Sequence, residues 1–433
     1  MINPNDVNLI IFDMDGTIIP SLPAVYESIK RAFTKLGWQI TFSPEDINQF
    51  FGVTTETAKG SLYEFITPSD SHLTIEEVRD RVRKEYEVTF RDIAQTYPRV
   101  KETLATLRKR KYKLAQYTNA STMYLNTVMS TLDMRGYFDH IECIQDNNLT
   151  KAELVRKFRE KFGGLTAAVV GDRSHDIKAA RDTNSLAIGV LFGYGGDEPQ
   201  QADIKINKFD DLLTIFDRRL PIFQRIILDI EQKKQKDKAF VIGISGIDGA
   251  GKTHFAESLE IYLKAKGHQA QLIHLDDFHN PKAIRYAGKD QADNYYNKSF
   301  NIQLIIDKLL APVKNKGELS LMLKTLNWET DKYENERKYN ATQNTIVIVE
   351  GVFLFRKEFS PYLDYKIFLD IPLEESKKRA LARDPKAIIS KYDDKYLPAQ
   401  VKYLKKYPPG KIADLIIDNK DLEYPKIKSI DKE

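Results

Sequence analysis

At 433 residues, the chain is too long for one ordinary core, so its length predicts two or three domains, with two as the simplest expectation. Hydrophobic residues make up 42% of the sequence and charged residues 30%, a balance that excludes a disordered or fibrous chain. The net charge of +4 is too small over this length to indicate a nucleic-acid-binding protein, although anionic substrates would suit it.

The cysteine content indicates a reducing compartment. Cys143 is the only cysteine, which excludes an internal disulfide and a cysteine-built zinc site. The first residues lack the basic and apolar regions of a signal peptide, and no apolar run approaches the length needed to cross a bilayer. We therefore expect a cytoplasmic protein with no membrane partner. The sequence leaves the oligomeric state open.

The first half of the chain alternates short apolar runs with amphipathic helical patterns. Strands are expected at Leu9–Phe12, Leu114–Tyr117, Ala167–Val170 and Leu186–Val190. This alternation predicts an α/β fold with a doubly wound, Rossmann-like sheet. Between about residues 20 and 96 the pattern is helical with no strong strand signal, which predicts a helical cap inserted after the first strand.

Two carboxylates follow the first predicted strand. Asp13 and Asp15 lie on a turn that continues with Gly16 and Thr17, at the edge of the sheet where open α/β folds bind ligands. One carboxylate could attack phosphorus and form an aspartyl-phosphate, while the other could protonate the leaving group and then activate water. For this segment alone, a strand-to-helix turn with solvated carboxylates is the alternative.

Later strand ends supply groups that suit the same chemistry. Thr118 and Asn119 offer a hydroxyl and an amide for phosphoryl oxygens, and Lys151 can neutralise the charge gathered there. Asp172 and Asp176 offer carboxylates that suit Mg²⁺. Each residue alone could be a helix cap or a surface charge, but their order at successive strand ends favours a phosphatase site.

These motifs resemble the haloacid dehalogenase superfamily over about residues 7–217. The resemblance implies a Mg²⁺-dependent phosphatase whose helical cap closes over small substrates. Segments 97–100 and 193–195 are similar to those of the phosphoglycolate phosphatase branch, except that Arg99 stands where that branch usually has glycine. The roles that the resemblance implies are nucleophile for Asp13, acid/base for Asp15, phosphate contact for Thr118 and Lys151, and metal ligand for Asp13, Asp15 through its backbone carbonyl, Asp172 and Asp176.

A charged stretch separates the two halves. Residues 218–238 read as a short helix running into a lysine-rich linker, so we expect a phosphatase domain at 1–217 and a second domain at 239–433. The second half repeats the α/β alternation. Its strands are expected at Phe240–Ile244, Gln271–His274, Thr345–Val349 and Tyr365–Leu369.

A phosphate-binding loop follows the first strand of the second half. Residues 246–253 read Gly-Ile-Asp-Gly-Ala-Gly-Lys-Thr, a full match to G-x-x-x-x-G-K-[ST] between a strand and a helix. Backbone N–H groups of such a loop surround the β-phosphate, while its lysine reaches the terminal phosphates and its threonine ligates Mg²⁺. The predicted ATP-binding residues are Gly246, Gly249, Ala250, Gly251, Lys252 and Thr253, with Thr253 also a metal ligand.

Further charged residues favour transfer of a phosphoryl group to an alcohol. Asp276 closely follows the second predicted strand, where it could accept a proton from a substrate hydroxyl, and Glu350 follows the third, where it suits the metal site. Arg379 and Arg383 lie one helical turn apart, so both could face the transferring phosphoryl group, although a solvated basic helix face has the same spacing. Leu422 stands where a guanine-reading motif needs aspartate, which disfavours a GTPase.

This half resembles the uridine kinase and phosphoribulokinase group of P-loop kinases over about residues 239–424. The resemblance implies ATP-dependent phosphorylation of a nucleoside or similar hydroxyl compound, with Asp276 as catalytic aspartate, Glu350 at the metal and Arg379 and Arg383 as lid arginines. Uridine kinases commonly place aspartate in the segment that holds the ribose, whereas residues 297–301 of this chain read Asn-Lys-Ser-Phe-Asn.

The two resemblances together predict a bifunctional enzyme. It would use Mg²⁺ and ATP, with a small phosphate ester as the substrate of one site, a nucleoside-like compound as the substrate of the other, and no nucleic-acid partner. The alternative is a nucleotide-responsive sensor, in which the second domain binds ATP without transferring phosphate and regulates the phosphatase.

Overall fold

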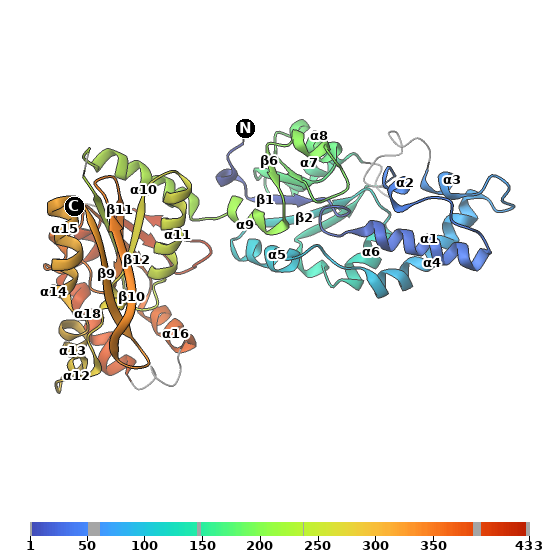
Figure 1. The fold of residues 1–433 in the computed structure, drawn as a ribbon. Helices are drawn as coiled ribbons and strands as arrows, with labels where there is room; N and C mark the ends of the chain where they lie inside the picture. Colours follow the sequence, from blue (N-terminus) through green and yellow to red (C-terminus); the bar gives the residue numbers. More distant parts are fainter. Residues whose placement is uncertain (1, 51–60, 145–148, 237, 384–390, 430–433) are drawn as a thin grey trace. The chain divides into compact units, whose positions relative to one another are not determined.

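The computed structural model describes residues 2–50, 61–144, 149–236, 238–383 and 391–429. The chain divides into two compact units, Met1–Asp217 and Arg218–Glu433. Each unit contains its own six-stranded, mostly parallel sheet with helices around it (Figure 1). The predicted fold class, two α/β domains, is therefore confirmed.

The first unit is built on a fully parallel sheet in the order β3-β2-β1-β4-β5-β6. Its strands are β1 (Leu9–Phe12), β2 (Lys113–Thr118), β3 (His140–Cys143), β4 (Ala167–Gly171), β5 (Leu186–Val190) and β6 (Ile204–Ile206). The four predicted strands form the centre of the sheet. The two further strands, β3 and β6, lie at its edges and are too short or too exposed to show a continuous apolar run.

Helices cover both faces of this sheet. They are α5 (Val100–Lys109), α6 (Thr122–Thr131), α7 (Lys151–Lys161), α8 (Ser174–Asp182) and α9 (Leu212–Ile215). Because successive strand residues point to opposite faces, Ile10 and Phe12 of β1 join the core with α5 and α6, while Leu9 and Ile11 join the core with α7 and α8. Burial on both faces explains why β1 reads as an unbroken apolar run.

The expected cap region is helical. It contains α1 (Ser21–Leu36), α2 (Pro44–Asn48), α3 (Leu62–Ile66) and α4 (Ile75–Ile93), while residues 51–60 of the predicted cap lie outside the described residues. Thr74 begins α4 through a capping box with Glu77, which satisfies backbone N–H groups at the helix start. Phe33 of α1 and Phe90 of α4 are both buried in one hydrophobic core with β1, which ties the cap helices to the sheet.

The second unit has the sheet order β14-β13-β12-β7-β11-β8, in which all pairs are parallel except β13 with β14. A separate antiparallel pair, β9 and β10, forms a hairpin outside this sheet. The strands are β7 (Phe240–Gly246), β8 (Ala270–His274), β9 (Leu319–Asn327), β10 (Lys332–Ala341), β11 (Ile346–Gly351), β12 (Tyr365–Asp370), β13 (Leu415–Asp418) and β14 (Lys426–Lys428). The four predicted strands are β7, β8, β11 and β12.

Helices of the second unit lie around this sheet and beside the hairpin (Figure 1). They are α10 (Leu220–Lys233), α11 (Lys252–Ala265), α12 (Lys282–Arg285), α13 (Gln291–Lys298), α14 (Ile302–Ile305), α15 (Ala311–Lys316), α16 (Leu373–Arg383), α18 (Leu397–Lys406) and α19 (Pro409–Ile412). Short 3-10 and π-helical turns include η5 (Leu275–Phe278) and η8 (Tyr392–Tyr396).

Helix α10 occupies the segment for which a linker helix is expected. Its residues Ile222, Phe223, Ile226 and Ile230 are buried in the same hydrophobic cluster as strand β7. The ring of Phe223 lies 5.3 Å from that of Phe255 on α11. Burying such side chains stabilises the fold by roughly 2 kcal/mol each, so α10 is an integral part of the second core.

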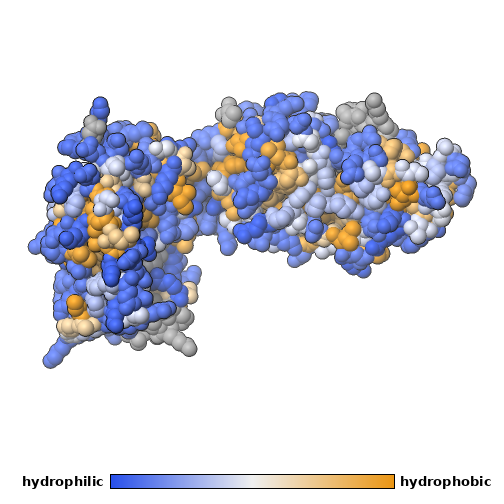
Figure 2. All heavy atoms as spheres, viewed as in Figure 1, coloured by the Kyte–Doolittle hydropathy of each residue, from blue (hydrophilic) through white to orange (hydrophobic). Residues whose placement is uncertain are grey.

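The surface is largely polar. Figure 2 shows hydrophilic residues over much of the visible face of each unit, with smaller hydrophobic patches between them. Within the described part of the chain, no helix is long and apolar enough to cross a membrane. Most large apolar side chains are instead packed in the interiors of the two units.

Candidate active sites

Three acidic residues converge at the carboxyl ends of β1 and β4. Asp13 follows β1, Asp172 follows β4, and Asp176 lies in the first turn of α8. One carboxylate oxygen from each lies within 4.8 Å of the others, and all three side chains are buried. Oxygen ligands at this spacing suit a hard divalent cation such as Mg²⁺. The adjacent pairing of β1 with β4 therefore brings together residues more than 150 positions apart.

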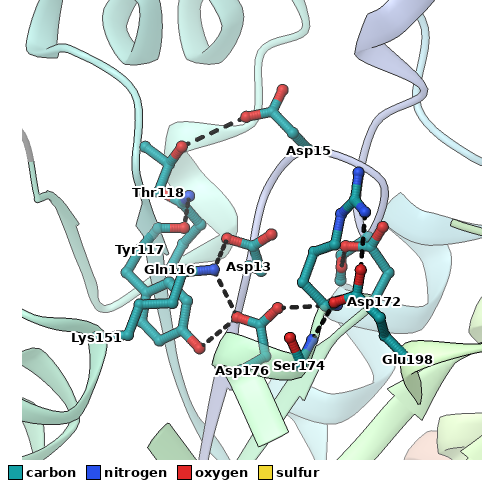
Figure 3. Close-up of polar contacts among 12 residues, drawn as sticks. Asp13, Asp15, Gln116, Tyr117, Thr118, Lys151, Asp172, Ser174, Asp176 and Glu198 are labelled. Carbon is teal, nitrogen blue, oxygen red and sulfur yellow. Dashed lines mark hydrogen bonds and ion pairs between the residues drawn. The ribbon is translucent and has the colours of Figure 1, made fainter. Parts of the chain in front are cut away.

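Lys151 supplies the positive charge of this cluster. Its Nζ lies 3.0 Å from Asp13 Oδ1 and 2.7 Å from Asp176 Oδ1 (Figure 3). Thr150 caps α7, so the helix begins at Lys151. Burial lowers the pKa of the lysine, but Asp13 and Asp176 outweigh this effect and hold the pKa above its ordinary value. The lysine is therefore a fixed cation beside the expected nucleophile.

The carboxylates carry more negative charge than Lys151 can balance. Burial raises the pKa of Asp13 well above its usual range; Lys151 opposes this shift, and Asp176 and Asp172 add to it. Burial and the charge of Asp176 raise the pKa of Asp172 to about 6. Because each raised pKa reports a penalty on the ionised form, a bound divalent cation would relieve the excess charge.

Close backbone packing holds Asp172 in place. The backbone N–H of Tyr194 donates to Asp172 Oδ2 at 2.6 Å. A Cβ on Gly16 would lie 2.3 Å from the same oxygen, and a Cβ on Gly193 would lie 2.4 Å from the Cβ of Asp172. Gly16 also has a φ of +77°, which favours glycine. The glycines in both turns therefore allow the chain to wrap tightly around the metal-ligand candidate.

The backbone conformation at Arg99 bears on the one departure from the phosphoglycolate phosphatase pattern. It precedes α5 with a φ of 64°, in the left-handed region. Glycine reaches this conformation freely, whereas another residue does so at a cost of about 1 kcal/mol. The glycine that is usual at this position thus matches a backbone requirement, and this chain meets the same requirement with arginine.

Asp15 lies apart from the three-carboxylate cluster and faces a different set of groups (Figure 3). Tyr124 Oη donates to Asp15 Oδ1 at 2.6 Å, and Thr118 Oγ1 donates to Asp15 Oδ2 at 3.4 Å. Burial raises the pKa of Asp15, and these hydroxyl donors oppose the rise. Thr118 therefore contacts the expected acid/base, with Asn119 next to it at the end of β2. Metal binding through the backbone carbonyl of Asp15 stays a prediction.

Tyr124 is a site residue that the sequence patterns do not reveal. It lies on α6, and its ring centroid is 6.0 Å from that of Tyr86 and 5.3 Å from that of Phe90, both on the cap helix α4. A tyrosine on an amphipathic helix is usually a core residue, and only the placement of α6 against Asp15 shows its second contact. The acid/base candidate is thus joined to the cap through one hydroxyl and an aromatic layer.

We expect Tyr124→Phe to lower the kcat of ester hydrolysis about tenfold, because a hydrogen bond to a charged group is lost. Removal of this donor destabilises ionised Asp15, so its pKa should rise further. The limb of the kcat/KM profile that reports proton loss from Asp15 should then move to higher pH. The measurement is hydrolysis of p-nitrophenyl phosphate across pH 5 to 9.

Tyr63→Phe is the matched control for this change. Tyr63 Oη lies 3.0 Å from Tyr86 Oη, so the rings of Tyr86 and Tyr124 lie between Tyr63 and Asp15. The loss of the Tyr63 hydroxyl should therefore change kcat by less than about twofold. An unchanged rate and pH profile in Tyr124→Phe would show that Tyr124 does not position Asp15.

A second constellation is formed at the carboxyl ends of β7, β8 and β11. The loop 246–253 joins β7 to α11, with positive φ at Gly249 (+72°) and Gly251 (+83°). Gly246 ends β7, and Ala250 is buried with its carbonyl accepting from Asn419 Nδ2 at 2.6 Å. Lys252 Nζ donates to Ile247 O at 3.0 Å. The loop thus has the strand-to-helix context that a phosphate-binding motif requires.

The predicted metal residues of this loop also meet. Thr253 Oγ1 donates to Glu350 Oε1 at 3.2 Å, and His274 Nδ1 lies 2.8 Å from the same oxygen. The hydrogen bond to Glu350 raises the pKa of His274. His274 was not among the predicted site residues, although its place at the end of β8, two residues before Asp276, is a usable signal. The imidazole of His274 could orient Glu350 toward a cation held at Thr253.

Asp276 and Arg383 line a cavity of about 520 Å³ together with Asp248 of the loop. Asp248 was also missed, because it occupies a variable position of the loop motif. Tyr295 Oη donates to both carboxylate oxygens of Asp248, at 3.0 and 2.9 Å, and Gln400 Nε2 donates at 2.9 Å. Burial raises the pKa of Asp248. An acidic group of the phosphate loop thus faces the same cavity as the expected catalytic aspartate.

Arg379 differs from the expectation that both arginines face one point. Its Nη1 donates to Gly249 O at 3.0 Å, and its Nη2 donates to Asn419 O at 3.0 Å and to Lys420 O at 2.6 Å. Of the two arginines, Arg383 lines the cavity, whereas Arg379 binds the backbone of the phosphate loop. Helical spacing places both on one face of α16, but these carbonyl groups and the carboxylate of Glu375, which accepts from Arg379 Nε at 3.0 Å, hold the guanidinium of Arg379 against the loop.

Two family models match the chain, one in each unit. Residues 10–190 match a model described as haloacid dehalogenase-like hydrolase. Residues 241–418 match a model described as phosphoribulokinase / uridine kinase family. The first match includes Asp13, Lys151, Asp172 and Asp176, and the second includes the loop 246–253, Asp276 and Glu350.

Curated relatives match the first half. A phosphoglycolate phosphatase from Vibrio parahaemolyticus is 25% identical over 48% of this chain and 96% of its own length. A phosphoglycolate phosphatase from Mannheimia succiniciproducens is 28% identical over 48% of this chain and 97% of its own length. The first half therefore corresponds to nearly the whole of these enzymes.

Solved structures match each half separately. A possible uridine kinase from Bacillus stearothermophilus is 25% identical, covers 46% of this chain and 98% of its own chain, and has a TM-score of 0.37. A predicted phosphoglycolate phosphatase from Haemophilus somnus is 26% identical, covers 48% of this chain and 98% of its own chain, and has a TM-score of 0.41.

Proposed function

We propose that the chain is a bifunctional enzyme, with a haloacid dehalogenase-like phosphatase in its first half and a kinase similar to the phosphoribulokinase / uridine kinase family in its second half. The main support for the proposed phosphatase activity is the convergence of three carboxylates with one lysine, namely Asp13, Asp172, Asp176 and Lys151. The contact between Thr253 and Glu350, beside a cavity that contains Asp276, supports the kinase half.

In the proposed phosphatase reaction, a carboxylate oxygen of Asp13 attacks phosphorus and the bond from phosphorus to the ester oxygen breaks. Asp15 gives its proton to that leaving oxygen. Asp15 then accepts a proton from water, which attacks the aspartyl-phosphate, releases inorganic phosphate and restores Asp13. Lys151 remains protonated and pairs with the phosphoryl oxygens. Asp13, Asp172 and Asp176 would hold Mg²⁺, which when bound would neutralise charge on the transferring group.

The substrate of this half is a small phosphate ester. Its relatives are phosphoglycolate phosphatases. Tyr86 of the helical cap region packs against Tyr124, and Tyr124 donates a hydrogen bond to Asp15. We propose that the cap residues Tyr86 and Phe90 help to select the alcohol portion, because their rings pack against Tyr124, which contacts the acid/base.

In the proposed kinase reaction, Asp276 accepts the proton of an acceptor hydroxyl. The hydroxyl oxygen then bonds to the γ-phosphorus of ATP, and the bond from that phosphorus to the β,γ-bridging oxygen breaks to release ADP. Backbone N–H groups of residues 246–253 and the ammonium of Lys252 hold the phosphates. Thr253 and Glu350 would hold Mg²⁺, and Arg383 would neutralise charge on the transferring group.

We propose a phosphatase domain at residues 1–217 and a kinase domain that includes α10. A cut to separate the activities therefore belongs between Asp217 and Arg218, because a cut after α10 would remove Phe223 from the second core. The single cysteine suits a reducing cytoplasm, where small-molecule substrates of both kinds occur.

Two assays on the full chain test this proposal. We expect phosphate release from p-nitrophenyl phosphate, and ADP release that a panel of hydroxyl compounds stimulates, both with Mg²⁺. Chelation with EDTA should remove both activities, and added Mg²⁺ should restore them. If no hydroxyl compound stimulates ADP release while ATP changes the rate of ester hydrolysis, the second domain is a nucleotide sensor instead.

A further inference from the structure

Tyr117 is a buried titratable side chain that the proposed phosphatase mechanism does not use. It lies near the end of β2, is fully buried, and belongs to the hydrophobic cluster that also contains Leu154 and Phe158 of α7. A phenylalanine ring would fill the same space in that cluster. The phenolic hydroxyl is therefore the part that needs an explanation, because burying a hydroxyl is unfavourable unless it forms a hydrogen bond.

The hydroxyl of Tyr117 forms its hydrogen bond with the carboxylate cluster. Tyr117 Oη donates to Asp176 Oδ1 at 2.8 Å (Figure 3). Lys151 Nζ donates to the same oxygen at 2.7 Å, and the backbone N–H of Arg173 donates to Asp176 Oδ2 at 3.2 Å. Since each carboxylate oxygen can accept from about two directions, Oδ1 is fully used and one direction stays open on Oδ2.

The ring of Tyr117 contacts the lysine of the same cluster. Lys151 Nζ lies 4.9 Å from the ring centroid of Tyr117, a distance at which the ring attracts a cation. Lys151 also donates to Asp13 Oδ1 at 3.0 Å, so its two bonds to carboxylates leave one N–H for a phosphoryl oxygen. One tyrosine thus contacts the ammonium with its ring, and with its hydroxyl the carboxylate that holds the ammonium.

The backbone of the neighbouring strand restricts Asp176 from another direction. A Cβ on Gly171, the last residue of β4, would lie 2.2 Å from Asp176 Cγ, so the carboxylate packs directly against that strand. Strands β2 and β4 lie on the two sides of β1, which precedes the expected nucleophile. Without the hydroxyl of Tyr117, Asp176 Oδ1 would keep only its bond to Lys151.

We infer that Tyr117 is a positioning residue of the phosphatase site, which fixes the carboxylate of Asp176 and through it the ammonium of Lys151. This inference rests on the proposed phosphatase function. The orientation of Asp176 decides whether its open acceptor direction faces the cation site that it shares with Asp13 and Asp172. Loss of a hydrogen bond that orients a metal ligand typically lowers metal affinity or activity by about 10- to 100-fold.

Tyr117→Phe removes the hydroxyl and keeps the ring, so it tests this role on the full chain. Calorimetric titration with Mg²⁺ alone should show a dissociation constant raised about tenfold or more. The kcat for p-nitrophenyl phosphate at saturating Mg²⁺ should fall about tenfold, because a hydrogen bond to a charged group is lost beside Lys151. ADP release by the second unit should not change.

Tyr112→Phe is the matched control, because the two tyrosines lie at opposite ends of one strand. Tyr112 is buried, precedes β2 and packs against Phe216 with the ring centroids 5.2 Å apart. It lies roughly 16 Å from Tyr117 along an extended strand, so its loss should change neither Mg²⁺ affinity nor kcat. If Tyr117→Phe lowers stability, the rise of its melting temperature on adding Mg²⁺ gives the same comparison of affinities.

A double-mutant cycle tests whether the hydroxyl acts through Asp176. In an Asp176→Ala background, which removes the acceptor, Tyr117→Phe should lower the remaining kcat by less than about twofold. Equal losses in both backgrounds would show that the hydroxyl does not act through Asp176, and the inference would be wrong.

Failure of this inference and failure of the phosphatase proposal give different results. If Tyr117→Phe binds Mg²⁺ and hydrolyses the ester as well as the unaltered chain, the inference is wrong and the phosphatase proposal stands. If the unaltered chain hydrolyses no phosphate ester, yet Tyr117→Phe weakens Mg²⁺ binding and Tyr112→Phe does not, the phosphatase proposal fails and Tyr117 still positions the cation site.

Discussion

Replacing Asp13 with asparagine is expected to lower kcat/KM for ester hydrolysis by roughly 10³-fold or more while leaving ATP-dependent transfer unchanged. The amide cannot attack phosphorus, yet it has nearly the same shape as the carboxylate. Lys151 keeps its contact with Asp176, so the local geometry should survive. The measurement is phosphate release from p-nitrophenyl phosphate beside ADP release, on the same preparation.

The same substitution should raise the melting temperature in EDTA at neutral pH. Burial raises the pKa of Asp13, so the ionised carboxylate destabilises the folded state as pH rises through that value. Asparagine removes this penalty, and its advantage should disappear in acid, where the carboxylate is protonated in both states. Reduced hydrolysis together with higher stability would separate a lost nucleophile from a damaged fold.

Asp182→Asn, at an exposed position of α8, is the matched control and should alter neither rate nor stability appreciably. If Asp13→Asn retained hydrolysis to within about tenfold, Asp13 would not be the nucleophile. If it removed both activities equally, two independent sites would be untenable.

Lys252→Ala is expected to lower ATP-dependent transfer by roughly 10²- to 10³-fold without affecting ester hydrolysis. Lys252 begins α11 and is the cation expected to reach the terminal phosphates. Its Nζ now donates to the carbonyl of Ile247, a contact that a phosphate oxygen could replace. The measurement is ADP release with the preferred acceptor, together with nucleotide affinity by calorimetry.

Lys264→Ala provides the control on the same helix. Lys264 is exposed and pairs with Glu260 one turn away, so its loss should cost less than about 1 kcal/mol and should not change transfer. A Lys252→Ala variant that transfers phosphate normally would remove the phosphate loop from the proposed mechanism.

Sequence patterns predicted four strands of each sheet, because most of those strands are buried on both faces and read as apolar runs. Strand β8 is the exception, since it lies at the edge of its sheet and is only partly buried. The hairpin β9 and β10 was missed. Most of the side chains of β10 are exposed, half of them are charged, and only Tyr339 and Ala341 of this strand are buried. Strand β13 was missed as well; only alternate residues of its four are buried, so it lacks the fully buried apolar run of β1.

The expected phosphatase residues Asp13, Asp172, Asp176 and Lys151 come together because each follows a strand end or begins a helix. Their meeting point follows from the topology, since parallel strands end at one edge of the sheet. Tyr124 and Asp248 show the opposite case. Their contacts join residues far apart in the chain, and no local pattern distinguishes them from ordinary core or loop residues.

The sequence by itself predicted the two proposed chemistries. Each prediction begins from a short run at one strand end, where neighbouring residues share one turn and their spacing fixes which groups lie together. Only the tertiary structure decided which cations are desolvated, that Arg379 binds the loop backbone, and that the hydroxyl of Tyr117 contacts Asp176. Burial and electrostatic environment depend on how distant segments pack, and a linear spacing carries no measure of that packing.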